Sequence, residues 1–220
     1  MNKKKLIIWD FDGVIADTEC LWMEHRRKLL NERYNLGWDL ATTNQHIGGM
    51  SWRTRLQTLQ NLGLDVDEKF EEEATLLDYQ ALEKGISQTP EIEKIFNCQI
   101  KQCIATGGTR EKTEKKLKAV NLTERFPSDK VFLAEMVKHG KPEPDLFLLA
   151  AEKMGEKPEN CVVIEDSIAG LTAAQKAGME VIAFVGSKMN NNPEYIAKVK
   201  TLGIKYIFDN MEDIYNVICR

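Results

Sequence analysis

Two aspartates, Asp10 and Asp12, directly follow a short apolar run from Leu6 to Trp9. Carboxylates at the end of a buried strand are costly unless a cation meets them. Because residues two apart in an extended backbone point to the same side, both acids can face one site while the carbonyl between them stays available as a ligand. Oxygen ligands of this kind suit Mg2+, and one carboxylate can act as a nucleophile while another moves protons. Taken alone, the pattern also fits a structural metal site or a helix-capping turn.

Three further stretches place polar groups at the end of an apolar run or in a loop nearby. The segment CVVIEDS carries Glu165–Asp166, and IATGG ends in Thr106–Gly108 just before an expected helix. Backbone amides at a helix start, together with a hydroxyl, can hold phosphate oxygens. The segment HGKPEPDLF carries Lys141 in a loop, where an ammonium group could neutralise a transferring phosphoryl group. Each stretch has an ordinary alternative, a helix cap or a solvated lysine, but all are expected at one edge of one sheet. We therefore interpret them as parts of one site.

The elements that must position these residues follow from the apolar pattern. Short runs that are apolar on both faces predict buried parallel strands. The predicted strands are Leu6–Trp9, Ile100–Thr106, Val131–Ala134, Cys161–Asp166 and Val181–Val185. The predicted helices between them are Arg110–Val120, Asp145–Met154 and Ile168–Ala177, the last with a left-handed cap at Gly178. Strands and helices that alternate in this way predict an α/β fold with a doubly wound parallel sheet.

The alternation is interrupted between Thr18 and Lys84, where only helical periodicity is found. The predicted helices there are Leu21–Tyr34, Trp52–Leu62 and Asp67–Glu83. Because this interval is far longer than a normal crossover, we predict an inserted all-helical domain over residues 17–85 and a core domain of residues 1–16 and 86–220. An insertion after the first strand of an open sheet is expected over the carboxyl ends of the strands, where such folds bind ligands.

The bulk composition excludes several classes of protein. The 220 residues are 43% hydrophobic and 29% charged, which is ordinary for a globular protein, and a formal net charge of −4 argues against nucleic-acid binding. No apolar stretch approaches the roughly 20 residues of a membrane span, and the run after the N-terminal lysines is too short for a signal peptide. The five cysteines lack a C-x-x-C pair, which favours reduced thiols over a disulfide framework. We expect a cytoplasmic protein, a monomer or weak homo-oligomer, with no nucleic-acid or membrane partner.

The order of these motifs resembles the haloacid dehalogenase superfamily, specifically its phosphatase and β-phosphoglucomutase-like branch with a helical cap. The resemblance is carried by D-x-D-G-V from Asp10, the hydroxyl of Thr106, G-K-P-x-P-D-x-F around Lys141, and E-D-S-x-x-G from Glu165. It spans the whole chain, and the last two motifs are long enough to be highly specific. It implies a Rossmann-like core domain with an inserted helical cap.

The resemblance also implies a role for each matching residue. Asp10 would be the nucleophile that forms an aspartyl-phosphate. Asp12 would be the acid/base that protonates the leaving oxygen and then activates water. Thr106 and the Gly107 amide would hold the phosphoryl oxygens, and Lys141 would stabilise the Asp10 anion and the transferring group.

The metal and the cap follow from the same resemblance. Mg2+ would bind the Asp10 side chain, the Asp12 carbonyl and Asp166, with Glu165 helping directly or through water. The insertion from Thr18 to Lys84 would be a mobile cap that closes over the substrate and excludes water that does not react.

The superfamily hosts several reactions, so the fold alone does not settle the function. Dehalogenase members have no acid two residues after the nucleophile and need no metal, and Asp12 and Glu165–Asp166 argue against that reaction. Phosphonate-cleaving members use a lysine near the start of the cap. The first lysine after the nucleophile here is Lys28, in a charged HRRK stretch typical of a solvated helix face.

The mutase members are a closer match. They carry a histidine in the first cap helix and a K-G-x-S-R loop, whereas this chain has Trp22 in that helix and the loop HIGGMSWRTRL. Gly48 and Trp52 stand where the lysine and arginine are expected, which favours hydrolysis over retention of a phosphorylated sugar. Gly49 could bring backbone close to the substrate and Arg53 could contact it, with a helix start and a solvated arginine as the equal alternative.

We therefore predict a Mg2+-dependent phosphatase that hydrolyses a small phosphorylated metabolite, such as a sugar phosphate, through an aspartyl-phosphate intermediate. The alternatives are a sugar-phosphate mutase of the β-phosphoglucomutase type and a non-catalytic phospholigand-binding protein.

Overall fold

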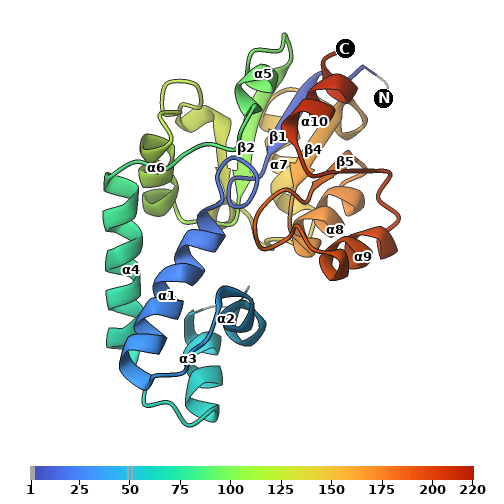
Figure 1. The fold of residues 1–220 in the computed structure, drawn as a ribbon. Coiled ribbons are helices and arrows are strands. Elements are labelled where there is room, and N and C mark those ends of the chain that lie inside the picture. The colour runs from blue at the N-terminus through green and yellow to red at the C-terminus, as the bar shows by residue number, and fades with distance from the viewer. Residues whose placement is uncertain (1–2, 49, 51) are drawn as a thin grey trace. The chain divides into compact units, whose positions relative to one another are not determined.

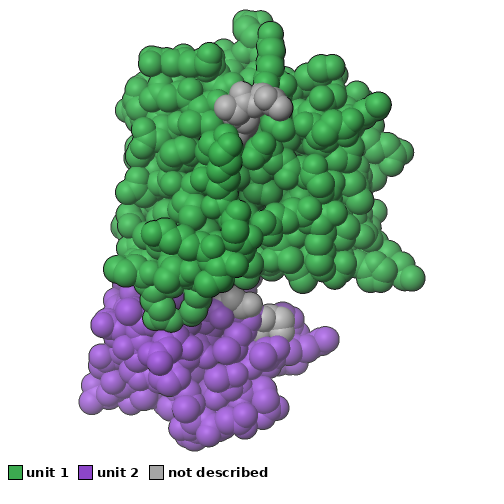
Figure 2. Space-filling view, turned by 90° about the vertical axis from the view of Figure 1, so that its right-hand side faces the viewer, with its two compact units in different colours: residues 1–17, 86–220 green, residues 18–85 purple. Residues whose placement is uncertain are grey.

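The computed structural model describes residues 3–48, 50 and 52–220. The chain divides into two compact units, which Figure 2 shows in different colours. One unit combines residues 1–17 with residues 86–220, and the other consists of residues 18–85.

The larger unit is built on a six-stranded sheet in which all neighbouring strands are parallel (Figure 1). The strands are β1 (Leu6–Trp9), β2 (Lys101–Thr106), β3 (Val131–Leu133), β4 (Cys161–Glu165), β5 (Glu180–Phe184) and β6 (Tyr206–Phe208), in the order β3-β2-β1-β4-β5-β6. The last residue of β1, Trp9, lies opposite Ile104 of β2 and Ile164 of β4. The residues that follow β1, β2 and β4 therefore meet at one edge of the sheet.

Helices cover both faces of this sheet, because successive strand residues point to opposite sides. Ile7 and Trp9 belong to one apolar cluster, and Leu6 and Ile8 belong to the other. The first cluster includes residues of α5 (Ile92–Phe96), α6 (Arg110–Ala119) and α10 (Met211–Ile218). The second includes residues of α7 (Asp145–Lys153), α8 (Ile168–Lys176) and α9 (Pro193–Thr201). The predicted doubly wound parallel sheet is confirmed.

The five predicted strands are present within one residue of their predicted ends, and Gly178 has the expected left-handed conformation, with φ of 70°. Strand β6 and helices α5, α9 and α10 were not predicted. Three 3-10 turns, Ser128–Lys130, Ala134–Met136 and Pro158–Asn160, complete the connections.

The smaller unit contains four helices over its described residues. They are α1 (Thr18–Tyr34), α2 (Leu40–Ile47), α3 (Trp52–Asn61) and α4 (Glu68–Glu83), of which α2 was not predicted. The apolar side chains buried within this unit include Leu30, Leu59 and Phe70, each 0% exposed.

A network of buried charges crosses the smaller unit. Arg26 of α1 donates to Asp78 and to Glu71 of α4, each at 3.1 Å. Asp78 is also 2.7 Å from His25 Nδ1, and Glu71 accepts from Arg55 of α3 at 2.7 Å. Removing charges from water is costly unless they are paired, so these contacts fix how α1, α3 and α4 meet within the unit.

The cysteines depart from the expectation of reduced thiols. Cys98 and Cys219 form a disulfide across a sequence separation of 121 residues, whereas Cys20, Cys103 and Cys161 are not disulfide-bonded. The two bonded residues follow α5 and α10, which pack together on one face of the sheet. A pairing at that separation leaves no local signal in the sequence.

Over the residues that the structure describes, no helix has the length and apolar character needed to cross a membrane.

Replacing Arg26 by methionine leaves Asp78 and Glu71 buried with less compensating charge. We expect the free energy of unfolding of the smaller unit to fall by about 3 kcal/mol. Urea denaturation followed by tryptophan fluorescence measures this change, because Trp22 lies on α1 beside Arg26. The matched control is Arg33→Met, which removes an exposed pair with Glu73 and is expected to cost about 1 kcal/mol or less. Equal losses in the two variants would contradict a stabilising role for the buried network.

Candidate active site

The loop after β1 is shaped by one glycine. Gly13 has φ of 80° and donates its backbone N–H to Ala16 O at 2.8 Å, which folds the chain back after Asp12. A β-carbon at Gly13 would lie 2.0 Å from Asp166 Oδ2. The position therefore requires glycine both for its backbone conformation and for the close approach of Asp166.

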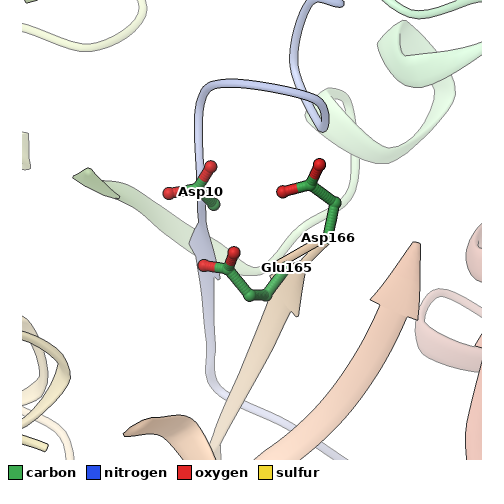
Figure 3. Close-up of side chains that lie close together, drawn as sticks. All are labelled: Asp10, Glu165 and Asp166. Carbon is green, nitrogen blue, oxygen red and sulfur yellow. The ribbon is translucent and has the colours of Figure 1, made fainter. Parts of the chain in front are cut away.

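Three buried acids meet where β1 and β4 end. Asp10, Glu165 and Asp166 each offer a carboxylate oxygen, and these oxygens lie within 4.8 Å of one another (Figure 3). The Asp10 backbone N–H donates to Ile164 O at 3.0 Å, which ties the start of the loop to β4. The parallel register therefore brings together acids that are far apart in the sequence.

Lys141 supplies a positive charge to this cluster. Its Nζ donates to Asp10 Oδ1 at 2.5 Å and to Glu165 Oε2 at 2.7 Å, and its side chain is 11% exposed. Burial by itself lowers the pKa of Lys141, but the charges of Asp10 and Glu165 outweigh burial and raise it. The lysine is therefore held in its charged form between two acids.

One lysine does not neutralise three carboxylates. Burial, reinforced by the charge of Glu165, raises the pKa of Asp10 to about 7, although Lys141 acts in the opposite direction. Burial and the charges of Glu165 and Asp10 also raise the pKa of Asp166 well above its usual value. The cluster holds more negative charge than its surroundings stabilise, so the oxygen donors fit a divalent cation such as Mg2+.

Other residues hold the two acids at the end of β4. Glu165 Oε1 accepts from the Ser167 backbone N–H at 3.0 Å and from its hydroxyl at 2.7 Å. Asp166 Oδ2 accepts from the Asn190 amide at 2.8 Å. A β-carbon at Gly170 would lie 2.1 Å from the Glu165 carboxyl carbon, so this glycine gives α8 room to start beside the acid. Both oxygens of Glu165 already accept hydrogen bonds, whereas a cation has fewer competitors at Asp10 and Asp166.

The predicted phosphate-binding residues follow the neighbouring strand. Thr106 ends β2 and is 1% exposed, and its hydroxyl accepts from the Gly108 backbone N–H at 3.4 Å. Gly107 is exposed, and no atom lies within 4 Å of the position that its β-carbon would occupy. Helix α6 begins a few residues later and is capped by Thr109. Because β2 pairs with β1, this loop starts at the same edge of the sheet as the loop that carries Asp10.

Asp12 has a partner that the sequence analysis missed. Lys116 of α6 places its Nζ 2.6 Å from Asp12 Oδ2. The available signal was the spacing of Thr113, Lys116, Leu117 and Val120, which puts a lysine on the apolar face of a helix. Asn190 was also missed, because the segment around it has no apolar periodicity.

Arg53 and Gly49 are the two residues predicted to contact the substrate from the cap, and the structure describes only Arg53. Arg53 lies in α3 of the smaller unit, is exposed, and places its guanidinium 5.0 Å from the Trp52 ring centroid. Gly49 lies outside the described residues. A substrate contact by either residue stays a prediction.

The parallel sheet, with acids at the ends of β1 and β4, places the protein in the α/β class, and comparison with known proteins identifies its family. The model of the haloacid dehalogenase-like hydrolases matches residues 4–178, so the chain belongs to that family. The resemblance and the enzyme class predicted from the sequence are confirmed.

Relatives and a solved structure agree with this assignment. The chain is 31% identical to fructose-1-phosphate phosphatase YqaB of Escherichia coli, over 80% of this chain and 94% of that one. It is 30% identical to a phosphorylated carbohydrates phosphatase of Thermotoga maritima, over 84% and 87% of the two chains. The structure of a haloacid dehalogenase-like protein of unknown function, ATU0790 of Agrobacterium tumefaciens, superposes with a TM-score of 0.85 and 25% identity over 97% of each chain.

The raised pKa of Asp10 predicts how stability depends on pH. The metal-free folded protein keeps the Asp10 proton up to about pH 7, whereas the unfolded chain loses it near 3.8. The folded state binds more protons between these values, so the contribution of Asp10 to stability falls as the pH rises through this window. Because a bound cation stabilises the ionised carboxylate, we expect Mg2+ to raise the free energy of unfolding by about 1–2 kcal/mol more near pH 8 than near pH 5.

Thermal unfolding of metal-free protein, with and without saturating Mg2+ at the two pH values, measures this difference. The control is Asp10→Asn, in which the pH-dependent part is expected to shrink. An equal effect of Mg2+ at both pH values would contradict the raised pKa.

Proposed function

We propose that the protein is a Mg2+-dependent phosphatase that hydrolyses a small phosphorylated metabolite, a sugar phosphate or similar monoester, through an aspartyl-phosphate on Asp10. The observation that carries this proposal is the contact of Lys141 with Asp10, beside two more buried acids. Lys141 offsets part of the negative charge of Asp10 and orients its carboxylate, and a bound cation would hold that carboxylate ionised, as a nucleophile requires. The names of the two relatives, a fructose-1-phosphate phosphatase and a phosphorylated carbohydrates phosphatase, support a sugar phosphate as the substrate.

In the first step of the proposed reaction, an Asp10 oxygen attacks phosphorus and the bond from phosphorus to the ester oxygen breaks. Asp12 gives its proton to the departing oxygen. In the second step, water attacks the phosphoryl group, Asp12 takes a proton from that water, and inorganic phosphate leaves Asp10. Lys141 offsets the charge of Asp10 and of the transferred group, while Thr106 and the Gly107 amide bind the phosphoryl oxygens.

Asp10, Asp166 and the Asp12 carbonyl would hold Mg2+, with Glu165 helping directly or through water. The metal, when bound, supplies positive charge to the phosphoryl oxygens. Residues 17–85 would serve as the cap over the substrate, with Gly49 and Arg53 as candidate contacts. Because sugar phosphates are charged metabolites of the cell interior, the proposal places the enzyme in the cytoplasm as a monomer or weak homo-oligomer.

The mutase alternative is less favoured because the chain has Trp22, Gly48 and Trp52 at the positions expected to hold the histidine, lysine and arginine of that branch. The non-catalytic alternative is less favoured because the predicted nucleophile, the acid/base and the lysine lie at one edge of one sheet.

A screen of phosphorylated metabolites for phosphate release, with and without Mg2+, tests the proposal. We expect hydrolysis of at least one sugar phosphate and loss of activity after chelation. Asp10→Asn is expected to lower kcat more than about 10³-fold, because the attacking oxygen is lost. Isomerisation of glucose 1-phosphate with a bisphosphate primer, in place of phosphate release, would favour the mutase. Full biological function of Asp10→Asn would favour the binding protein.

A further inference from the structure

Lys116 is a buried ammonium group on the face of α6 that packs against the sheet. The side chain is 1% exposed, and its helical neighbour Leu117 belongs to the apolar core. An unpaired charge in such a place costs several kcal/mol, so the position demands a partner. Among the residues that the structure describes, the acid paired with Lys116 is Asp12.

The lysine contacts two consecutive residues of the loop that carries the nucleophile. Its Nζ donates to Asp12 Oδ2 at 2.6 Å and lies 4.7 Å from the centroid of the Phe11 ring. A cation over an aromatic face is attracted to it. The two contacts restrict the direction of the lysine and, through the hydrogen bond, the orientation of the Asp12 carboxylate.

Lys116 also lies close to the loop after β2, Thr106–Gly108, which is predicted to bind phosphate. A β-carbon at Gly108 would be 3.5 Å from Lys116 Nζ and 2.9 Å from Thr113 Oγ1. The absence of a side chain at Gly108 thus lets α6 bring the ammonium group close to the loop that follows β2. The lysine itself is shielded from solvent, whereas 31% of the Asp12 side chain is exposed.

Three of the four acids of the site contact one of two lysines, and the fourth, Asp166, accepts from Asn190. Lys141 contacts Asp10 and Glu165, and Lys116 contacts Asp12. The amine of Lys116 is shielded from solvent and contacts Asp12 directly, so we expect its effect on the reaction to pass through Asp12.

We propose that Lys116 is a positioning residue for proton transfer in the proposed phosphatase reaction, holding one oxygen of Asp12 so that this carboxyl group is presented to the leaving oxygen in a fixed orientation. This inference rests on the proposed function of Asp12. A lysine that only stabilises the fold would slow all substrates alike. A lysine that positions the proton donor matters most when the leaving oxygen needs a proton.

Two substrates separate these roles. Fructose 1-phosphate releases an alkoxide-like oxygen that must be protonated, whereas p-nitrophenyl phosphate releases an oxygen that is stable as an anion. For Lys116→Met we expect kcat/KM on fructose 1-phosphate to fall about 10- to 100-fold, within the range of general acid catalysis, and kcat/KM on p-nitrophenyl phosphate to fall less than about threefold. The ratio kcat/KM is the readout because it reports the first step, before Asp12 activates the water that both substrates need. The matched control is Lys115→Met, which removes an exposed lysine paired with Glu111 on the same helix and is expected to change neither rate.

Two further variants distinguish a positioning role of Lys116 from a folding defect. Lys116→Arg keeps the cation, and we expect it to recover part of the rate on fructose 1-phosphate. In an Asp12→Asn background, where the proton donor is already lost, we expect Lys116→Met to cause no further loss that is selective for fructose 1-phosphate.

The outcomes distinguish the two proposals. If the wild type hydrolyses neither compound, nor any sugar phosphate from the screen, the proposed function fails. If the wild type is active and Lys116→Met lowers both kcat/KM values equally, or Lys116→Met remains selective in the Asp12→Asn background, the positioning role is overturned and the phosphatase stands.

Discussion

An excess of negative charge at the carboxyl ends of β1 and β4 constrains the structure of the larger unit. Three buried acids lie around one lysine. The raised pKa values of Asp10 and Asp166 indicate that the charge of this lysine does not offset all three carboxylates. Such a cluster is unfavourable in a protein interior unless a further cation joins it. The surrounding structure serves this arrangement: Gly13 and Gly170 leave room for the carboxylates, while Ser167 and Asn190 orient them.

Asp12 differs from Asp10 in the lysine that it contacts, although both aspartates lie in the same loop. Asp10 and Asp12 are two residues apart, yet each has its own lysine, from elements on opposite faces of the sheet. Lys141 precedes α7 and Lys116 lies on α6. Carboxylates with different partners can behave differently, as the proposed roles of nucleophile and proton donor require. If Lys116 positions Asp12 as proposed, a substitution in α6 changes the reaction without contact with the substrate.

The sequence was sufficient for the parts of the site that follow apolar strands. The common location of Asp10, Thr106 and Glu165 could be predicted because each lies at the end of an apolar run, and parallel strands end at a common edge; their roles in the reaction stay predictions. Lys116 and Asn190 could not be assigned, because their partners are set by tertiary packing and not by local pattern. The Cys98–Cys219 disulfide was missed for the same reason. Strand β6 is only three residues long and half-buried, so its apolar signal is weak.

The order of the strands along the chain has a consequence for synthesis. Strand β1 is made first, but its neighbours β2 and β4 begin at Lys101 and Cys161, after the whole helical unit. At a ribosomal rate of about 5–20 residues per second, the apolar segment Leu6–Trp9 waits roughly 10–30 s before β4 emerges. The helices of residues 18–85 form local contacts and can fold during this interval. Strand β1, which leads into Asp10, is therefore an apolar segment without its partner strands during this interval.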